Sequence, residues 1–214
     1  MAEEKSRSRL VLASASPRRL ALLERVGLAP DLLCPADIDE TPERFETPRR
    51  LSVRLAQEKA KAIVELPLVK DLGANVFILA ADTVVGLGRR SVPKADTEQD
   101  VKASLALLSG RSHWVYSTVC LIDPKGRMTY RCSETKVRFK RLSREDIHAY
   151  TASGEWRGKA GGYAIQGRAE AFVRTLAGSH SGVVGLPLYE TVSLLEGAGF
   201  PVFHSLMHKP SLLI

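Results

Sequence analysis

The stretch that decides the fold is Leu10–Gly27, with the sequence LVLASASPRRLALLERVG. It opens with Leu10–Ala13, a short apolar run typical of a buried strand, and its later leucines and valine recur at roughly helical spacing. Between these parts, Ser16 suits a helix N-cap and Pro17 the first helical position, while Gly27 suits the residue just past a helix. The stretch therefore predicts a strand, a tight turn and a helix.

Two arginines stand in the first turn of this predicted helix. A helix N-terminus carries unpaired N–H groups and a partial positive charge, so basic side chains are mildly unfavourable there. Arg18 and Arg19 are explained if an anion, most simply a phosphate, lies against them and against Ser14 and Ser16. The alternative is a solvated pair of arginines on an ordinary helix.

The next predicted helix begins at Thr47–Pro48, reaches about Ile63 and carries a lysine on its apolar face. Lys59 lies at four-residue spacing from Leu55 and continues the row that begins at Leu51. It is therefore drawn toward the interior or a cleft. Equally, its stem could run to the surface and leave the ammonium group in solvent.

The most apolar run of the chain, Val76–Val85, predicts a central strand that contains one carboxylate, Asp82. A buried carboxylate is costly without a cation, a metal ion or several hydrogen bonds. Asp82 is therefore expected to have such a partner or to face a cleft, and a functional role is favoured over a purely structural one. The basic segment Arg89–Lys94 follows as a predicted loop, from which Lys94 could reach a phosphate or remain solvated.

The rest of the chain predicts further helices and a hairpin. They are a helix around Val101–Leu108, a hairpin of His113–Ile122 and Met128–Phe139, a helix from Ser143 to near Gly154, and a helix through Leu194 and Leu195. The order strand, helix, helix, strand, helix, hairpin, helix indicates an α/β protein with a mixed sheet.

A glycine-rich turn, Gly158–Gly167, lies between the last two predicted helices. Its glycines allow close approach of the backbone to a ligand, Tyr163 could pack on a planar ring, and Gln166 could pair with the edge of a base. Alone, this is a weak signal.

Composition limits the partners that the chain could take. With 214 residues, 44% of them hydrophobic, it fits one domain, with two lobes at most. The net charge of +7 favours an anionic partner: a nucleotide, nucleic acid or an acidic membrane surface. The basic residues are spread along the chain without an aromatic-interleaved block, so nucleic-acid binding is the weaker option.

Cysteines and histidines indicate neither a disulfide framework nor a metal site. Cys34, Cys120 and Cys132 are odd in number and form no CxxC pair, which favours a reducing, cytoplasmic setting. His204 and His208 have the spacing of a helical metal pair, but no third ligand is near them in the sequence. The first residues are charged and precede no apolar segment of signal or membrane-spanning length, so we expect neither export nor insertion.

Six motifs occur along the chain in one order. They are SASPRR (14–19), AADT (80–83), the Lys94 loop, LSGR (108–111), the turn at 158–167 and VGLPL (184–188). Together they closely resemble the Maf family of nucleotide pyrophosphatases over about Leu10–Gly199. The resemblance implies an elongated mixed β-sheet flanked by helices, of the Maf and inosine-triphosphatase type, with two lobes and a central cleft. It also implies a single domain over 1–214, with residues 1–8 and the tail after about 203 peripheral.

The resemblance further implies an activity and a set of site residues. Members of the family are cytoplasmic hydrolases, commonly dimeric, that use a divalent metal, Mg²⁺ or Mn²⁺, to cleave nucleoside triphosphates to the monophosphate and pyrophosphate. By position, the catalytic residues are Lys59, Asp82 and Lys94, the substrate-binding residues are Ser14, Ser16, Arg18, Arg19, Glu40, Thr83 and Gln166, and the metal ligands are Asp82 and Glu40. These positions explain the arginines at a helix start, the lysine on an apolar face and the aspartate in an apolar strand.

Within the family, the turn GYAIQG together with Thr83 resembles the branch that acts on dTTP, UTP and related or modified pyrimidine nucleotides. Another branch prefers 7-methyl-GTP and usually has Ser and Glu in this turn. After Gln166 the chain departs from the common pattern, so Arg168 and Glu170 could alter the rim of the pocket. The rival functions are a nucleotide sensor that inhibits septum formation without turnover and, third, a nucleic-acid-binding module.

Overall fold

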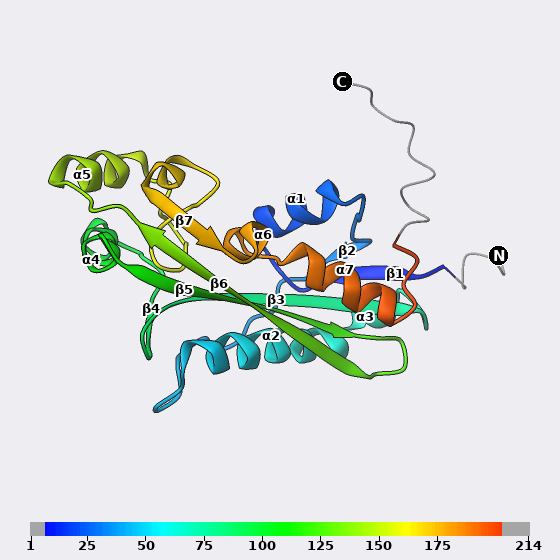
Figure 1. Cartoon of the computed structure of the whole chain (residues 1–214). Coiled ribbons are helices and arrows are strands. Elements are labelled where there is room, and N and C mark those ends of the chain that lie inside the picture. The colour runs from blue at the N-terminus through cyan, green and yellow to red at the C-terminus, as the bar shows by residue number, and fades with distance from the viewer. Residues whose placement is uncertain (1–6, 203–214) are drawn as a thin grey trace, which may run out of the picture.

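The structure is a computed structural model that describes residues 7–202, and its seven strands form one mixed sheet (Figure 1). The strands are β1 (Arg9–Leu12), β2 (Leu32–Leu33), β3 (Val76–Leu87), β4 (Arg90–Val92), β5 (Ser112–Ile122), β6 (Met128–Phe139) and β7 (Val173–Ala177). Their order is β2-β1-β3-β5-β6-β7, with β4 paired to β3. β1 runs parallel to β2 and β3, and the other pairs are antiparallel. The predicted mixed sheet, its central strand and its hairpin are confirmed.

The prediction of a loop over the whole of Arg89–Lys94 is wrong. Three of its residues, Arg90–Val92, form β4 and pair with the end of β3, where Leu87 lies opposite Arg90. The turn between the two strands contains Gly88 at a φ of 61°, a conformation that glycine adopts without steric cost. Because β4 has only three residues, its sequence shows no alternating pattern long enough to predict a strand.

Helices cover both faces of the sheet (Figure 1). They are α1 (Pro17–Arg25), α2 (Pro48–Val64), α3 (Pro67–Lys70), α4 (Glu98–Leu108), α5 (Arg144–Ser153), α6 (His180–Val184) and α7 (Leu188–Gly197), with a 3-10 helix at Arg168–Phe172. α2 lies along one face of the sheet, while α1, α6 and α7 lie over the other. The predicted starts of α1 and α2 at Pro17 and Pro48 are confirmed.

β1 is buried on both faces, which explains its unbroken apolar sequence. Successive side chains of a strand point to opposite faces. Leu10 and Leu12 pack in the cluster that contains α1 and α7, whereas Val11 and Ala13 pack in the cluster that contains α2. Because no solvent-facing side remains, the strand shows no polar alternation.

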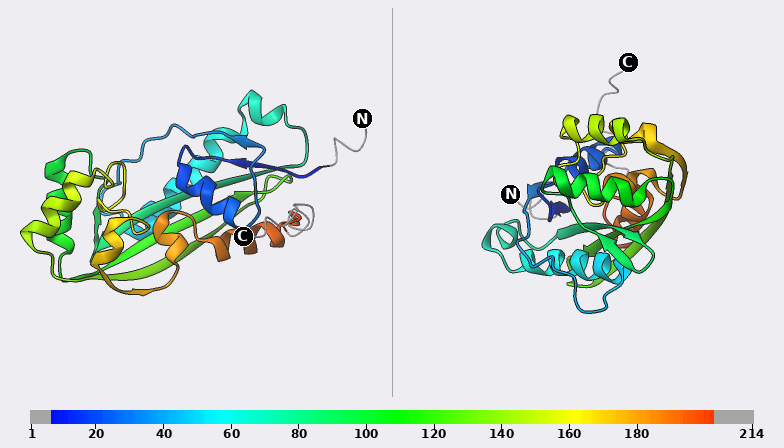
Figure 2. Two further views of the ribbon diagram at one scale, coloured as in Figure 1. Left: turned by 90° about the horizontal axis from the view of Figure 1, so that it is seen from above. Right: turned by 90° about the vertical axis from the view of Figure 1, so that its left-hand side faces the viewer.

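A second core lies at the end of the sheet that carries α4 and α5. Figure 2 shows the molecule elongated along the sheet, with these two helices together at one end. Trp156, Tyr150 and Phe139 are fully buried there. His113, 1% exposed, lies in the same core, where its Nε2 is 2.8 Å from the hydroxyl of Tyr163. Its Nδ1 is buried without a hydrogen-bond partner among the described residues.

This buried histidine is expected to make the fold sensitive to mild acid. Burial lowers the pKa of His113 from 6.5 to about 4. Between these values the unfolded chain binds a proton that the folded protein excludes, so stability falls as the pH falls from about 6.5 to about 4. The shift corresponds to about 3 kcal/mol at most. Urea unfolding at a series of pH values measures this slope.

The matched variants are His113→Gln and His148→Gln, because His148 is exposed on α5. We expect His113→Gln to lose much of the dependence on pH between about 6.5 and 4, and His148→Gln to keep it. Equal slopes in the two variants would assign the acid sensitivity to other groups.

Candidate active site

A cavity of about 420 Å³ opens between the β1–α1 turn, α2, β3 and the turn at 158–167. It is lined by all ten residues that the sequence places in the site: Ser14, Ser16, Arg18, Arg19, Glu40, Lys59, Asp82, Thr83, Lys94 and Gln166. These residues come from six separate segments of the chain. The structure therefore brings the predicted set together in one place.

The cavity lies against the part of β3 that follows its pairing with β1 and precedes its pairing with β4. β1 pairs with β3 as far as Leu79, and β4 pairs with it from Val85. Asp82 and Thr83 fall between these limits and both line the cavity. As consecutive strand residues, they point to opposite faces of the sheet. This is also where the parallel strand β1 ends, the usual place for ligands in α/β sheets.

The turn after β1 keeps polar groups near the start of α1. The backbone N–H of Ser16 donates to the Oγ of Ser14 at 3.2 Å. Ser16 occupies the predicted N-cap position, but its own hydroxyl makes no capping hydrogen bond. Ser16 is therefore the N-cap residue, as predicted, but its side chain does not cap the helix. Its hydroxyl is available to a ligand in the cavity.

The two arginines of this turn have different surroundings. Arg19 donates from Nε to the carbonyl oxygen of Gly185 at 2.9 Å and from Nη1 to the Oγ of Ser14 at 3.0 Å. The Arg18 side chain makes no hydrogen bond or ion pair within residues 7–202. Burial lowers the pKa of both guanidinium groups. Arg19 is thus held in place, while Arg18 has all its donors available.

Lys59 bridges the two carboxylates of the cavity. Its Nζ lies 2.6 Å from the Oδ1 of Asp82 and 2.6 Å from the Oε1 of Glu40. Lys59 and Asp82 are 8% and 5% exposed, so the ammonium group ends in the cavity and does not reach the outer surface. The expected partner of Asp82 is therefore this lysine.

Glu40 also binds the second predicted lysine, because Lys94 contacts its other oxygen, Oε2. Burial alone would raise the pKa of Glu40, but hydrogen bonds from Lys59 and Lys94 outweigh it and lower the pKa to about 2. Glu40 therefore stays ionised throughout the neutral range. The four side chains form a continuous network of alternating charge.

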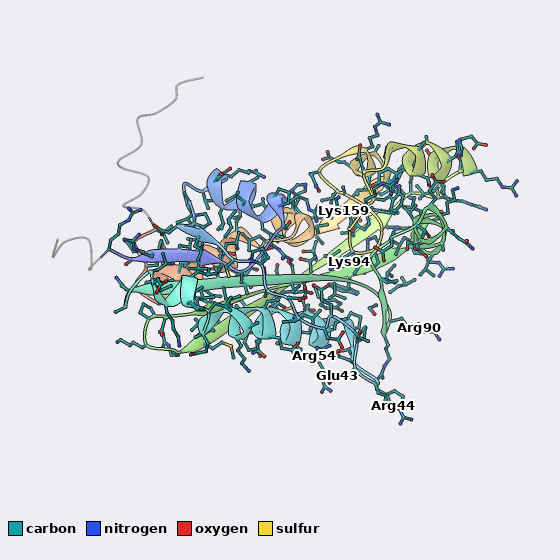
Figure 3. All side chains as sticks on the ribbon, turned by 180° about the vertical axis from the view of Figure 1, so that it is seen from behind. Glu43, Arg44, Arg54, Arg90, Lys94 and Lys159 are labelled. Atoms are coloured by element: carbon teal, nitrogen blue, oxygen red, sulfur yellow. The ribbon has the colours of Figure 1, made fainter. Side chains whose placement is uncertain are left out.

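The loop that carries Glu40 is held to α2 by Arg54. This arginine donates to the carbonyl oxygen of Thr41 at 2.9 Å and, through two nitrogens, to both carboxylate oxygens of Glu46 at 2.9 Å. Figure 3 shows Arg54 beside Glu43, while Arg44 points away from the body of the molecule. A bidentate arginine pair is a rigid contact, so Arg54 fixes the position from which Glu40 enters the cavity.

Thr83 lies on the other side of β3, toward α6. Its Oγ1 is 2.8 Å from the Oγ of Ser117 and 3.4 Å from the carbonyl oxygen of Gly185. Gly185 is the residue that also binds Arg19. No sequence pattern indicates Ser117, and Gly185 is marked only as part of the VGLPL motif, since these contacts join residues far apart in the chain.

The glycine-rich turn is fixed against the Lys94 loop. The N–H of Gly161 donates to the carbonyl oxygen of Pro93 at 3.1 Å, and Ala160 forms a β-bridge with Lys94. At Gly161, with φ at 68°, a Cβ atom would lie 2.9 Å from a methyl group of Val85. Glycine is therefore required here both for its conformation and for the close contact with β3.

This turn corrects one prediction, agrees with a second and supplies one residue that was missed. Tyr163 lines the cavity, but it is only 5% exposed and its ring packs edge-on against His113 and Phe139, so it serves the second core more than the stacking on a ligand that we expected. Gln166 is exposed and lines the cavity, as expected. Lys159 also lines it and was not singled out, although a lysine beside a glycine in such a turn was a usable signal.

Arg168 and Glu170 do not line the cavity, so the expectation that they shape its rim is wrong. They lie in the 3-10 helix at Arg168–Phe172. The backbone N–H of Arg168 donates to the carboxylate of Glu155 at 2.8 Å, and its side chain lies 3.4 Å from the same group. Arg168, where the sequence departs from the common pattern of the family, therefore contacts Glu155 outside the cavity.

The donor set of the cavity fits a metal ion that the substrate helps to bind. Within residues 7–202, no group of three or more His, Cys, Asp or Glu side chains could hold a metal ion. Asp82 and Glu40 supply two carboxylates close to one another, because both contact the same ammonium group. Mg²⁺ is commonly bound by one or two carboxylates together with substrate phosphates. His204 and His208 lie outside the described residues.

Residues 9–198 match the family model described as Maf-like protein. This chain belongs to the Maf family. Among curated Maf relatives, a dTTP/UTP pyrophosphatase of Nitrobacter hamburgensis is 59% identical over 196 residues, which cover 92% of this chain and 95% of the relative. One of Mesorhizobium japonicum with the same description is 58% identical over 197 residues, with coverage of 92% and 95%. Another, of Agrobacterium fabrum, is 55% identical over 197 residues, with the same coverage.

A more distant likeness is to a solved HAM1 protein from Coxiella burnetii, with 18% identity and a TM-score of 0.42 over 64% of this Maf chain and 75% of that chain. Within the described part of the chain, no helix has both the length and the apolar character needed to cross a membrane.

Proposed function

We propose that this Maf protein is a nucleoside triphosphate pyrophosphatase that hydrolyses dTTP, UTP and related or modified pyrimidine nucleotides to the monophosphate and pyrophosphate. One observation carries the proposal: all ten predicted residues line one cavity, in which cations surround two carboxylates. Relatives at 55–59% identity are described as dTTP/UTP pyrophosphatases, which supports the pyrimidine branch.

The reaction transfers the α-phosphoryl group to water. A water oxygen bonds to the α-phosphorus while the bond from that phosphorus to the oxygen bridging to the β-phosphate breaks. Lys59 contacts Oδ1 of Asp82, so Oδ2 is the oxygen that orients the water and accepts its proton. Lys59 and Lys94 hold phosphate oxygens and stabilise negative charge on the triphosphate. Ser14, Ser16, Arg18 and Arg19 hold the phosphate chain at the start of α1.

The base and the metal occupy the other predicted positions. Gln166 pairs with the edge of the pyrimidine, and Thr83 contributes to the choice of nucleotide. Asp82 and Glu40 would hold a divalent cation, Mg²⁺ or Mn²⁺, together with the phosphates. Bound there, such a cation neutralises phosphate charge and favours the hydroxide form of a nearby water.

The proposal extends to the organisation of the protein. We expect a single domain of two lobes over residues 1–214, a homodimer in solution and a cytoplasmic location. The activity would clean the nucleotide pool or accompany arrest of cell division.

Release of pyrophosphate from a panel of nucleoside triphosphates with Mg²⁺ or Mn²⁺ tests the proposal. Pyrophosphate release from dTTP and UTP, well above release from purine nucleotides, is expected. Preference for 7-methyl-GTP would move the protein to the other branch of the family. Nucleotide binding without turnover would favour a sensor, and steeply salt-dependent binding of oligonucleotides would favour a nucleic-acid-binding module.

A further inference from the structure

The cationic side chains that line the cavity fall into two groups. Lys59 and Lys94 contact Glu40 or Asp82, so the two positive and two negative charges of this network balance. Three further cations line the cavity: Arg18, Arg19 and Lys159. The surplus charge of the cavity is therefore +3, and it lies on these three side chains.

Lys159 forms no ion pair with a carboxylate in the described part of the chain, although Glu155 is near enough to act on its charge. Its Nζ donates to the backbone carbonyl oxygen of Arg157 at 2.8 Å, which uses one of the three donors of the ammonium group. The remaining donors are available to a ligand in the cavity. In this respect Lys159 resembles Arg18 and differs from Lys59 and Lys94.

The position of Lys159 is fixed by the backbone around it. Its N–H donates to the carbonyl oxygen of Trp156 at 3.1 Å, and the next residue, Ala160, bridges to Lys94. Figure 3 shows Lys94 and Lys159 near one another on the two loops. Because this backbone is already ordered, binding through Lys159 costs freedom of the side chain but requires no ordering of the turn.

Lys159 and Arg18 repel one another across the cavity. Burial lowers the pKa of Lys159 and the positive charge of Arg18 lowers it further, while the negative charge of Glu155 opposes them with a smaller effect. Arg18 comes from the first turn of α1 and Lys159 from the glycine-rich turn, so the two charges face the cavity from different segments. Neither side chain forms an ion pair among the described residues, so an anion bound between them would relieve their repulsion.

We propose that Lys159 is a phosphate ligand of the substrate and that, together with Arg18, it binds the two phosphates that leave as pyrophosphate. This inference rests on the proposed function. The leaving group carries most of the negative charge of the triphosphate, and the surplus positive charge of the cavity lies on Arg18, Arg19 and Lys159. Lys59 and Lys94 already share their charge with the carboxylates that face the reacting phosphorus.

Titration calorimetry with inorganic pyrophosphate and with dTMP, on the full-length protein, tests the assignment without requiring turnover. For Lys159→Met we expect binding of pyrophosphate to weaken about tenfold to a hundredfold, the effect of losing a charged hydrogen bond. Binding of dTMP should change by less than about twofold. Lys159→Arg should restore much of the affinity for pyrophosphate. The matched control is Lys102→Met, an exposed lysine on α4 that pairs with Glu98 outside the cavity.

Arg18→Met and the double variant with Lys159→Met complete the test. Because both cations contact one anion, their effects should be coupled, so the double variant should lose a different amount from the sum of the two single losses. Unchanged pyrophosphate binding in Lys159→Met would overturn the proposal, as would loss of dTMP binding alone or an equal loss in Lys102→Met. A parent protein that binds pyrophosphate but hydrolyses no nucleotide would refute the proposed function and not this assignment. Thermal unfolding of each variant confirms that the fold is retained.

Discussion

Asp82→Asn is expected to lower turnover of dTTP by about 10²- to 10⁴-fold, the usual contribution of a general base. The amide keeps the size of the side chain and an oxygen that can accept the hydrogen bond from Lys59, but it cannot take a proton from water. Glu40 remains to balance Lys59, which it contacts at 2.6 Å. Steady-state pyrophosphate release and calorimetric binding of a non-hydrolysable dTTP analogue measure the two effects separately.

The control for Asp82→Asn is Asp71→Asn, because Asp71 is exposed at the end of α3. It should leave turnover unchanged. Retained turnover in Asp82→Asn would remove Asp82 from the chemical step. If thermal unfolding shows that Asp82→Asn does not fold, the carboxylate is required for stability, and the loss of turnover says nothing about its role in the chemical step.

Lys59→Met is expected to destabilise the protein by about 3–5 kcal/mol and to abolish most of its activity. Removing one partner of a buried ion pair leaves the other charge uncompensated, and this is the source of the loss. Here the loss falls chiefly on Asp82, which is 5% exposed and has its Oδ1 2.6 Å from the Nζ of Lys59. Urea unfolding at neutral pH gives the change in the free energy of unfolding.

The double variant Lys59→Met with Asp82→Asn separates stability from activity. Removing both charges avoids the uncompensated carboxylate, so the double variant should recover a large part of the stability lost by Lys59→Met. Its turnover should remain as low as that of Asp82→Asn. If Lys59→Met were as stable as the parent, the ion pair with Asp82 would not contribute to stability, and the role of Lys59 would be limited to binding the substrate.

Residues that are out of place for their local structure carried most of the site prediction. Asp82 in an apolar strand and Lys59 on an apolar helix face are each explained by the other, because they form one ion pair. Arg18 and Arg19 at the start of α1 mark the edge of the same cavity. The longer helices and strands were also predictable, since their caps and periodicities are local, whereas the short helices α3 and α6 were not predicted.

Contacts between distant segments could not be predicted in this way. The bond from Arg19 to Gly185 joins residues 166 positions apart, and no local pattern indicates it. Tyr163 looked suited to a ligand because it is an aromatic ring in a glycine-rich turn, yet its hydroxyl contacts the buried His113, on β5. β4 has three residues, too few for a reliable alternating pattern.

The stretch of β3 that faces the cavity has a consequence for how this protein can change. Asp82 and Thr83 are neighbours in the chain, but they leave the strand on opposite faces and contact different partners, Lys59 on α2 and Ser117 on β5. A substitution at Thr83 therefore meets a separate set of neighbours from those that hold Asp82. Substitutions at Thr83 can therefore change which nucleotide binds while the contacts of Asp82 stay the same, so substrate preference can evolve without a change in the reaction.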